Sequence, residues 1–129
     1  MTDSNAIASR IRQVLLGALL LPVVITLGGC HSYHVDTTVE NRTGAGLQLL
    51  EVDYPSASFG ANALANGATF PYRIQFRNSG PLKVQYTAAD GRQVQIDGPT
   101  VAERQEGTLR IVLLPGGKAE FDPQLTPAK

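Results

Sequence analysis

The sequence predicts an all-β domain over residues 35–122, a small antiparallel β-sandwich of about seven strands. Apolar and polar residues alternate there with a period of two, which is typical of strands that bury one face. Gly, Pro, Asn and Asp recur between the alternating segments and predict turns. No stretch of this region has the 3.6-residue period of an amphipathic helix. A small barrel would bury the same faces and is the alternative architecture.

The first predicted strand covers residues 35–40, where Val35, Thr37 and Val39 share one face. Turn-forming residues at 41–44 predict that the chain returns antiparallel into a second strand, 47–54. The alternation in that strand changes phase between Leu49 and Leu50. The change predicts a β-bulge or, alternatively, a strand that is buried on both faces.

Residues 55–60 are rich in Ser, Pro and Gly and predict a loop, with Tyr54 before it and Phe59 within it. Aromatic side chains offer a large contact area at a low entropic cost, so Tyr54 and Phe59 are candidate contacts for a ligand or a partner. In the alternative interpretation, Phe59 packs the loop onto the core.

Residues 70–76 form the clearest predicted strand, and Pro71 places it at an edge or at a strand's start because proline lacks a backbone donor. Two more strands, 82–86 and 94–96, are joined by a hairpin with Asp90-Gly91 in its turn.

The C-terminal third of the chain begins with a predicted connection, residues 98–107, that is long enough to cross between sheets. Residues 109–114 are apolar on both faces and predict a central, buried strand. A last short strand follows around 119–121, and residues 123–129 predict a flexible tail.

The predicted core consists of the apolar side chains on the buried faces of these strands. Its members are Val39, Leu49, Val52, Phe70, Tyr72, Ile74, Phe76, Leu82, Val84, Tyr86, Val94, Ile96, Leu109, Ile111, Leu113 and Phe121.

The run Leu64, Asn66, Gly67, Phe70, Tyr72 is similar to the Leu-x-Pro-Gly-x-x-Tyr corner of fibronectin type III domains and related immunoglobulin-like sandwiches. In those domains the tyrosine hydroxyl bonds to the backbone a few residues upstream. Here Asn66 replaces the proline and Phe70 occupies the tyrosine position. The resemblance implies an immunoglobulin-like sandwich in which Tyr72 takes the role of the corner tyrosine.

An apolar segment, residues 14–27, precedes the predicted domain. Its fourteen residues, with Pro22 among them, are too few for a transmembrane helix, which needs about 20. Arg10 and Arg12 stand before the segment and small residues at its end, as in a cleaved signal peptide.

The run Leu27, Gly28, Gly29, Cys30 at the end of that segment resembles the lipobox of bacterial lipoprotein signal peptides. The resemblance implies that residues 1–29 are removed, that diacylglycerol is attached to the Cys30 thiol, and that the new amine is often acylated too. Residues 30–34 then form a lipidated tether, and the partner of this end is a membrane. His31 follows Cys30 where aspartate would signal retention in the inner membrane. In a bacterium with two membranes, the resemblance therefore implies the outer membrane, with the domain facing the periplasm.

Charge composition and histidine placement exclude several functions. Residues 30–129 contain ten acidic residues and nine Lys or Arg without a basic patch, which argues against nucleic-acid binding. His31, His34 and Asp36 are potential metal ligands, but three such residues in a row beside a lipid anchor make no defined coordination cage. We therefore predict no metal and no cofactor.

Catalytic equipment is equally sparse. Both histidines lie in the tether, no serine occupies a Gly-x-Ser-x-Gly elbow, and Glu51 and Asp53 share a strand face where solvated charges are expected. The sequence therefore predicts a non-catalytic envelope lipoprotein that binds another protein or supports an assembly. The alternative is binding of a small ligand or glycan through the loop from Tyr54 to Gly60.

Overall fold

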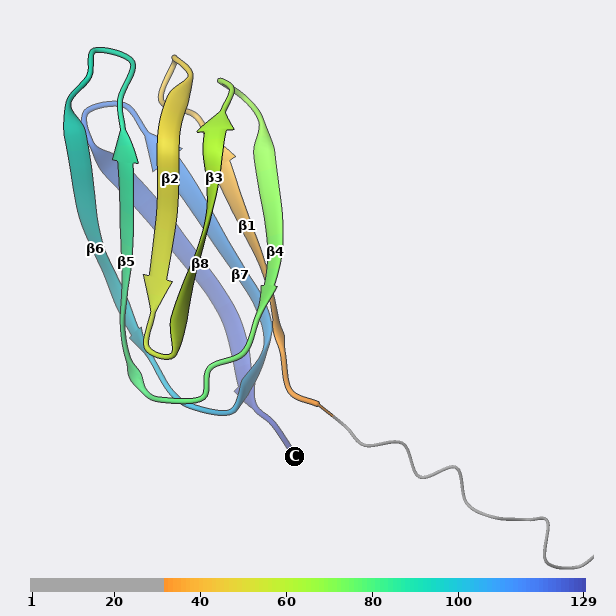
Figure 1. The fold of residues 1–129 in the computed structure, drawn as a ribbon. Coiled ribbons are helices and arrows are strands. Elements are labelled where there is room, and N and C mark those ends of the chain that lie inside the picture. Colours follow the sequence, from red (N-terminus) through yellow and green to blue (C-terminus); the bar gives the residue numbers. More distant parts are fainter. Residues whose placement is uncertain (1–31) are drawn as a thin grey trace, which may run out of the picture. The chain divides into compact units, whose positions relative to one another are not determined.

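Two four-stranded sheets form a β-sandwich over residues 32–129, the part of the chain that the computed structural model describes (Figure 1). One sheet has the order β4-β1-β7-β8 and the other β3-β2-β5-β6. The strands are β1 (Val35–Asn41), β2 (Leu47–Tyr54), β3 (Ala57–Leu64), β4 (Thr69–Ile74), β5 (Gly80–Thr87), β6 (Gln93–Val101), β7 (Gln105–Leu114) and β8 (Lys118–Pro127). The prediction of an all-β antiparallel sandwich is confirmed, except that one strand pair, β1 with β7, is parallel. The lipobox-like run, Cys30 included, lies outside the described residues.

The chain changes sheets after β1. The turn at 41–44 does reverse the chain, as we predicted, since β2 runs opposite to β1 (Figure 1). However, β2 lies in the other sheet and does not pair with β1. β1 pairs instead antiparallel with β4 and parallel with β7. The parallel pair joins segments far apart in sequence, and no local turn signal could reveal it.

β3 is an eighth strand in the region where the sequence predicted a loop. Only the turn at 55–56 separates it from β2, with which it pairs from Leu47↔Leu64 to Tyr54↔Ala57. Its small residues have low strand propensity, but pairing with β2 overrides that preference. The close pairing of β3 with β2 requires glycine at position 60, since a Cβ atom there would collide with the Leu50 carbonyl oxygen.

Strand lengths near the C-terminus also differ from the prediction. β6 and β7 extend into the predicted connection 98–107 and leave a turn of 102–104, which does cross between the sheets. β8 continues to Pro127, paired with Gln105, so most of the predicted tail 123–129 is strand. Its prolines are tolerated because β8 lies at a sheet edge.

The predicted β-bulge in β2 is confirmed. The register of β2 against β5 shifts between Gln48 and Glu51, and Leu49 adopts the left-handed backbone conformation with φ = 52°. The bulge turns Leu49 outward, where 66% of it is exposed, and places Leu50 in the core. Our assignment of Leu49 to the core was therefore wrong.

The core between the sheets follows the predicted alternation most closely in β5 and β7, and departs from it in β2 and in the edge strands. Tyr72 on edge strand β4 is 46% exposed, so it is not a core residue. Four predicted core residues are half-buried: Phe70, Val94, Ile96 and Phe121. The core also contains residues that we did not predict: Val35, Leu47, Leu50, Phe59, Leu64 and Val101. Val112 is buried as well but does not belong to this cluster.

The sandwich has two ends with different connections (Figure 1). At the end where β1 begins, called the N-terminal end here, lie the turns 55–56, 75–79 and 102–104 and the C-terminus of the chain. The opposite end carries the other turns, 42–46, 65–68, 88–92 and 115–117.

The bulge predicts opposite effects for two neighbouring leucines. Leu49→Gly should leave the free energy of unfolding unchanged or raise it by up to about 1 kcal/mol, because glycine adopts a positive φ without steric cost. Leu50→Ala should lower it by about 2–5 kcal/mol, because it opens a cavity in the core. Urea unfolding of both variants measures the difference, and equal losses would contradict the bulge.

Candidate functional site

The edge strands β3 and β4 of the two sheets lie side by side (Figure 1). Five of the eight aromatic side chains gather there. We call this cluster the aromatic seam: Tyr54, Phe59, Phe70, Tyr72 and Phe76. The Phe59 and Tyr72 rings stack with their centroids 4.7 Å apart and their planes 8° from parallel. The other ring pairs in the seam are 6.1–6.4 Å apart. The seam thus closes one open side of the sandwich with stacked rings.

Burial decreases from the inside of the seam to its surface. Phe59 is only 5% exposed and contacts the rings of Tyr54, Phe70 and Tyr72. Our two predicted contact residues, Tyr54 and Phe59, do lie together, with 6.3 Å between their ring centroids. Phe59 packs into the core, as the alternative interpretation had it, and supports Tyr54 and Tyr72 from behind.

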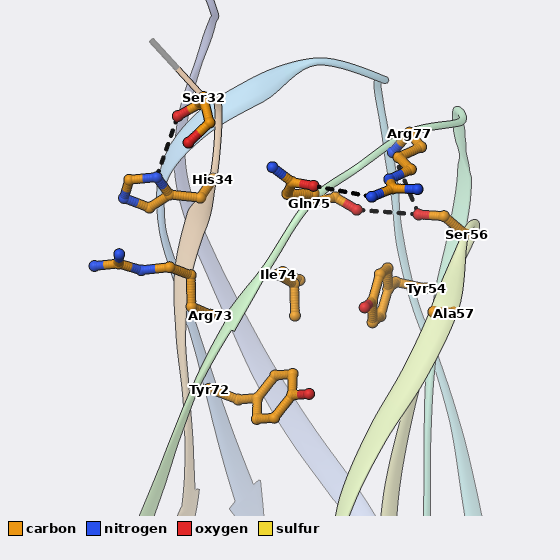
Figure 2. A pocket seen from close by; sticks show the side chains of 10 residues that line it. All are labelled: Ser32, His34, Tyr54, Ser56, Ala57, Tyr72, Arg73, Ile74, Gln75 and Arg77. Carbon is orange, nitrogen blue, oxygen red and sulfur yellow. Dashed lines mark hydrogen bonds between the residues drawn. The ribbon is translucent and has the colours of Figure 1, made fainter. Parts of the chain in front are cut away.

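A hollow of about 560 Å³ lies at the N-terminal end of the seam (Figure 2). Tyr54 and Tyr72 turn their hydroxyl groups toward it, with Ile74 between them (Figure 2). Its lining residues are Ser32, His34, Tyr54, Ser56, Ala57, Tyr72, Arg73, Ile74, Gln75 and Arg77. The hollow therefore combines aromatic surface with hydroxyl, amide and guanidinium groups.

Hydrogen bonds hold the rim of the hollow in place. The Ser56 hydroxyl donates to the Gln75 carbonyl oxygen at 3.0 Å and accepts from the Arg77 backbone N–H at 3.3 Å. The Arg77 guanidinium donates to the Gln75 side-chain oxygen at 3.4 Å. The turn at 55–56 is thereby attached to the segment that follows β4.

The two arginines of the hollow differ in their partners. Arg73 forms an ion pair with Asp36, with 3.0 Å between Nε and Oδ1, and points away from the tyrosines (Figure 2). Arg77 has no carboxylate partner among residues 32–129. Burial, and then the neighbouring Tyr72, raise the pKa of Tyr54, while Arg77 acts in the opposite direction. The Tyr54 phenol therefore stays neutral at physiological pH and can both donate and accept.

Two other features bear on chemistry. No group of three or more His, Cys, Asp or Glu side chains that could hold a metal ion occurs within residues 32–129. On the outer face of β2, a hydrogen bond to Asp53, together with the charge of Asp53, raises the pKa of Glu51. The Gln85 side chain donates a hydrogen bond to Asp53 at 3.0 Å.

Within residues 32–129, no helix is long and apolar enough to cross a bilayer.

Comparison with known proteins finds no relative: the chain matches no family model, no curated protein and no solved structure. The interpretation of the seam therefore rests on its own geometry.

Tyr72, Arg73, Gln75 and Arg77, in β4 and just after it, line the site and were not predicted as site residues. The alternation in residues 70–76 assigned Tyr72 to the core, since period two identifies a face and not its depth. Pro71 was the available signal, because it marked an edge strand, and side chains at an edge are only partly covered.

The seam predicts unequal roles for its two stacked rings. Phe59→Ala should lower the free energy of unfolding by about 3–5 kcal/mol, because a buried phenylalanine is lost. Tyr72→Ala should cost only about 1 kcal/mol, because much of that ring is already in water. Urea unfolding measures both, and a loss at Tyr72 as large as that at Phe59 would show that Tyr72 belongs to the core.

Proposed function

We propose that the protein is a lipid-anchored bacterial envelope protein whose non-catalytic sandwich binds another protein or supports an assembly. The observation that carries the proposal is the lipobox-like run ending at Cys30, five positions before β1 begins at Val35. Five residues span at most about 17 Å, so a lipid on Cys30 would keep the start of β1 close to the bilayer. One acyl chain binds a membrane only marginally, whereas two or three give stable anchoring.

The composition of the domain supports a protein partner. The near balance of charges in residues 30–129 offers neither a nucleic-acid surface nor a polybasic attachment to lipid. The seam, in contrast, exposes aromatic surface beside two sheet edges, and both features are used in protein recognition.

The anchor is tested by mass spectrometry of the protein purified from the membranes of its own host. We expect an N-terminus at Cys30 that carries diacylglycerol on sulfur, because the thiol is the acylated group of the lipobox family. Cys30→Ser should abolish processing and acylation, since serine offers no thiol. A native protein that retains residues 1–29, or an unmodified Cys30, would refute the anchor.

The choice between the inner and the outer membrane is tested by a variant at position 31 and a control at position 32. In a host with two membranes, the native protein should fractionate with the outer membrane, and His31→Asp should move it to the inner one. Ser32→Ala, one residue further on, is the control and should change nothing.

Binding of a glycan is the second candidate function, and the hollow is the observation that favours it. Two tyrosines with inward hydroxyls, together with Gln75 and Arg77, are groups suited to the apolar faces and hydroxyls of a sugar. The loop that we predicted to carry this function contributes Tyr54, Ser56 and Ala57 to the lining.

The glycan proposal is tested with a panel of oligosaccharides that includes peptidoglycan fragments. We expect binding by the native sequence and a loss of at least about tenfold in the variant Tyr72→Ala/Arg77→Ala, since both groups face the ligand. Arg92→Ala, at the opposite end, should stay within about twofold. No binding by any member of the panel, or equal binding by the double variant, would remove this candidate.

A further inference from the structure

Four strands lie at the edges of the two sheets: β4 and β8 in one, β3 and β6 in the other. An edge strand presents backbone N–H and C=O groups that have no neighbour and can pair with another chain. Proteins commonly protect such edges with proline or with charged side chains. The four edges of this sandwich differ in that protection.

Three of the four edge strands carry such residues. β4 contains a proline and an arginine, β6 an aspartate and a proline, and β8 two prolines and three charged residues. The residues are Pro71 and Arg73 in β4, Asp97 and Pro99 in β6, and Lys118, Glu120, Asp122, Pro123 and Pro127 in β8.

β3 has no such residue. Its eight residues, Ala57–Leu64, include neither proline nor a charge, and all except Phe59, Asn62 and Leu64 are Ala, Ser or Gly. Within the described chain β3 pairs only with β2, which leaves its other edge without a strand neighbour. Small side chains give another backbone close access to that edge. β3 is therefore the edge best suited to accept an additional strand.

The surroundings of β3 add side-chain recognition to the main-chain edge. Tyr72 of β4 stacks on Phe59 of β3 and is 46% exposed, so apolar surface lies directly beside the edge. Arg77, at the N-terminal end of the seam, lacks a carboxylate partner among residues 32–129. Strand addition combines these two elements, because main-chain bonds give affinity and contacts with alternate side chains give specificity.

We infer that β3 is a docking edge for an extended segment of another polypeptide. The segment pairs with the backbone of residues 57–63, places an apolar side chain on Tyr72 and directs an acidic side chain toward Arg77. The docking stretch ends before Leu64, because the Leu64 carbonyl oxygen already accepts a hydrogen bond from the Asn41 side chain at 2.9 Å. This inference rests on the proposed protein-binding function and names the kind of partner. The choice of another polypeptide over a second copy also rests on the proposed anchor.

A second copy of this chain fits the edge poorly. β3 runs from the N-terminal end to the opposite end of the sandwich (Figure 1). Antiparallel pairing of two β3 strands about a two-fold axis would turn the second copy end for end. The two N-terminal ends would then face opposite directions, which anchoring of both copies in one membrane forbids. The partner is therefore a different polypeptide.

The experiment uses the full-length protein in its host. A photo-crosslinking amino acid replaces Ser58 on β3 in one strain and Gln95 on β6 in another, because both side chains are exposed on edge strands of the same sheet. The crosslinked segment is mapped by mass spectrometry and synthesised as a peptide. Binding of that peptide is then measured, together with amide hydrogen exchange of the protein.

We expect crosslinks from position 58 to one segment of another protein, and slower exchange of β3 amides when the peptide is bound. Ser58→Lys/Asn62→Lys should weaken peptide binding by at least about tenfold, because lysines on an edge oppose strand addition. Gln93→Lys/Gln95→Lys adds the same charge to β6 and should stay within about twofold. Unfolding in urea should confirm that both double variants fold.

Three results would overturn the inference. The first is crosslinks to a second copy of this chain, and the second is no crosslink at position 58. The third is that the bound peptide does not slow amide exchange in β3 and the lysine substitutions at 58 and 62 do not weaken its binding. Crosslinks at position 95 without any at 58 would refute the β3 edge and leave protein binding standing. No crosslink at either position would count against both. The anchor is unaffected by each outcome, since the Cys30 experiment tests it separately.

Discussion

A buried asparagine joins the two sheets, and the arrangement of the other strands depends on it. Asn41 ends β1 with 0% of its surface exposed. Its Nδ2 donates to the carbonyl oxygens of Ala45 and Leu64 at 2.8 and 2.9 Å, and its Oδ1 accepts from the Thr43 backbone N–H and hydroxyl at 3.0 and 2.7 Å. All its polar groups are therefore satisfied, which makes burial of the amide tolerable, whereas a half-satisfied amide would be costly.

The position of this residue determines where the functional surface forms. β1 belongs to one sheet and Leu64 ends β3 in the other, so the Asn41 side chain fixes the crossing between layers. Its backbone also bonds to Ala68 and Gly67 in the turn that leads into β4. The edges β3 and β4 are thereby brought together on one side of the sandwich. Stacking of Phe59 on Tyr72 then closes that side, and the aromatic seam is the result.

The proposed roles of the seam use different parts of one surface. The free edge of β3 offers main-chain groups, which recognise an extended polypeptide whatever its sequence. The hollow offers hydroxyl, amide and guanidinium groups, which suit a compact polar ligand. Tyr72 contributes to both because it lies between them, exposed on one side and supported by Phe59 on the other. Both roles are recognition and need no reacting group.

The sequence by itself determined the strands of strong alternation, the phase change at Leu49 and Leu50 and the lipobox-like run, because each is written in neighbouring residues. It limited Pro71 to an edge or to a strand's start for the same reason. Of the site, the sequence identified Tyr54 and Phe59 as a pair but did not show how deeply Phe59 is buried. It did not identify Tyr72 and Arg77 as site residues. Only the tertiary structure decided that residues 57–64 form a strand, that β1 pairs with β7, and that Tyr72 is exposed. The physical reason is that strand pairing and burial depend on partners distant in sequence, which local propensity and periodicity do not contain.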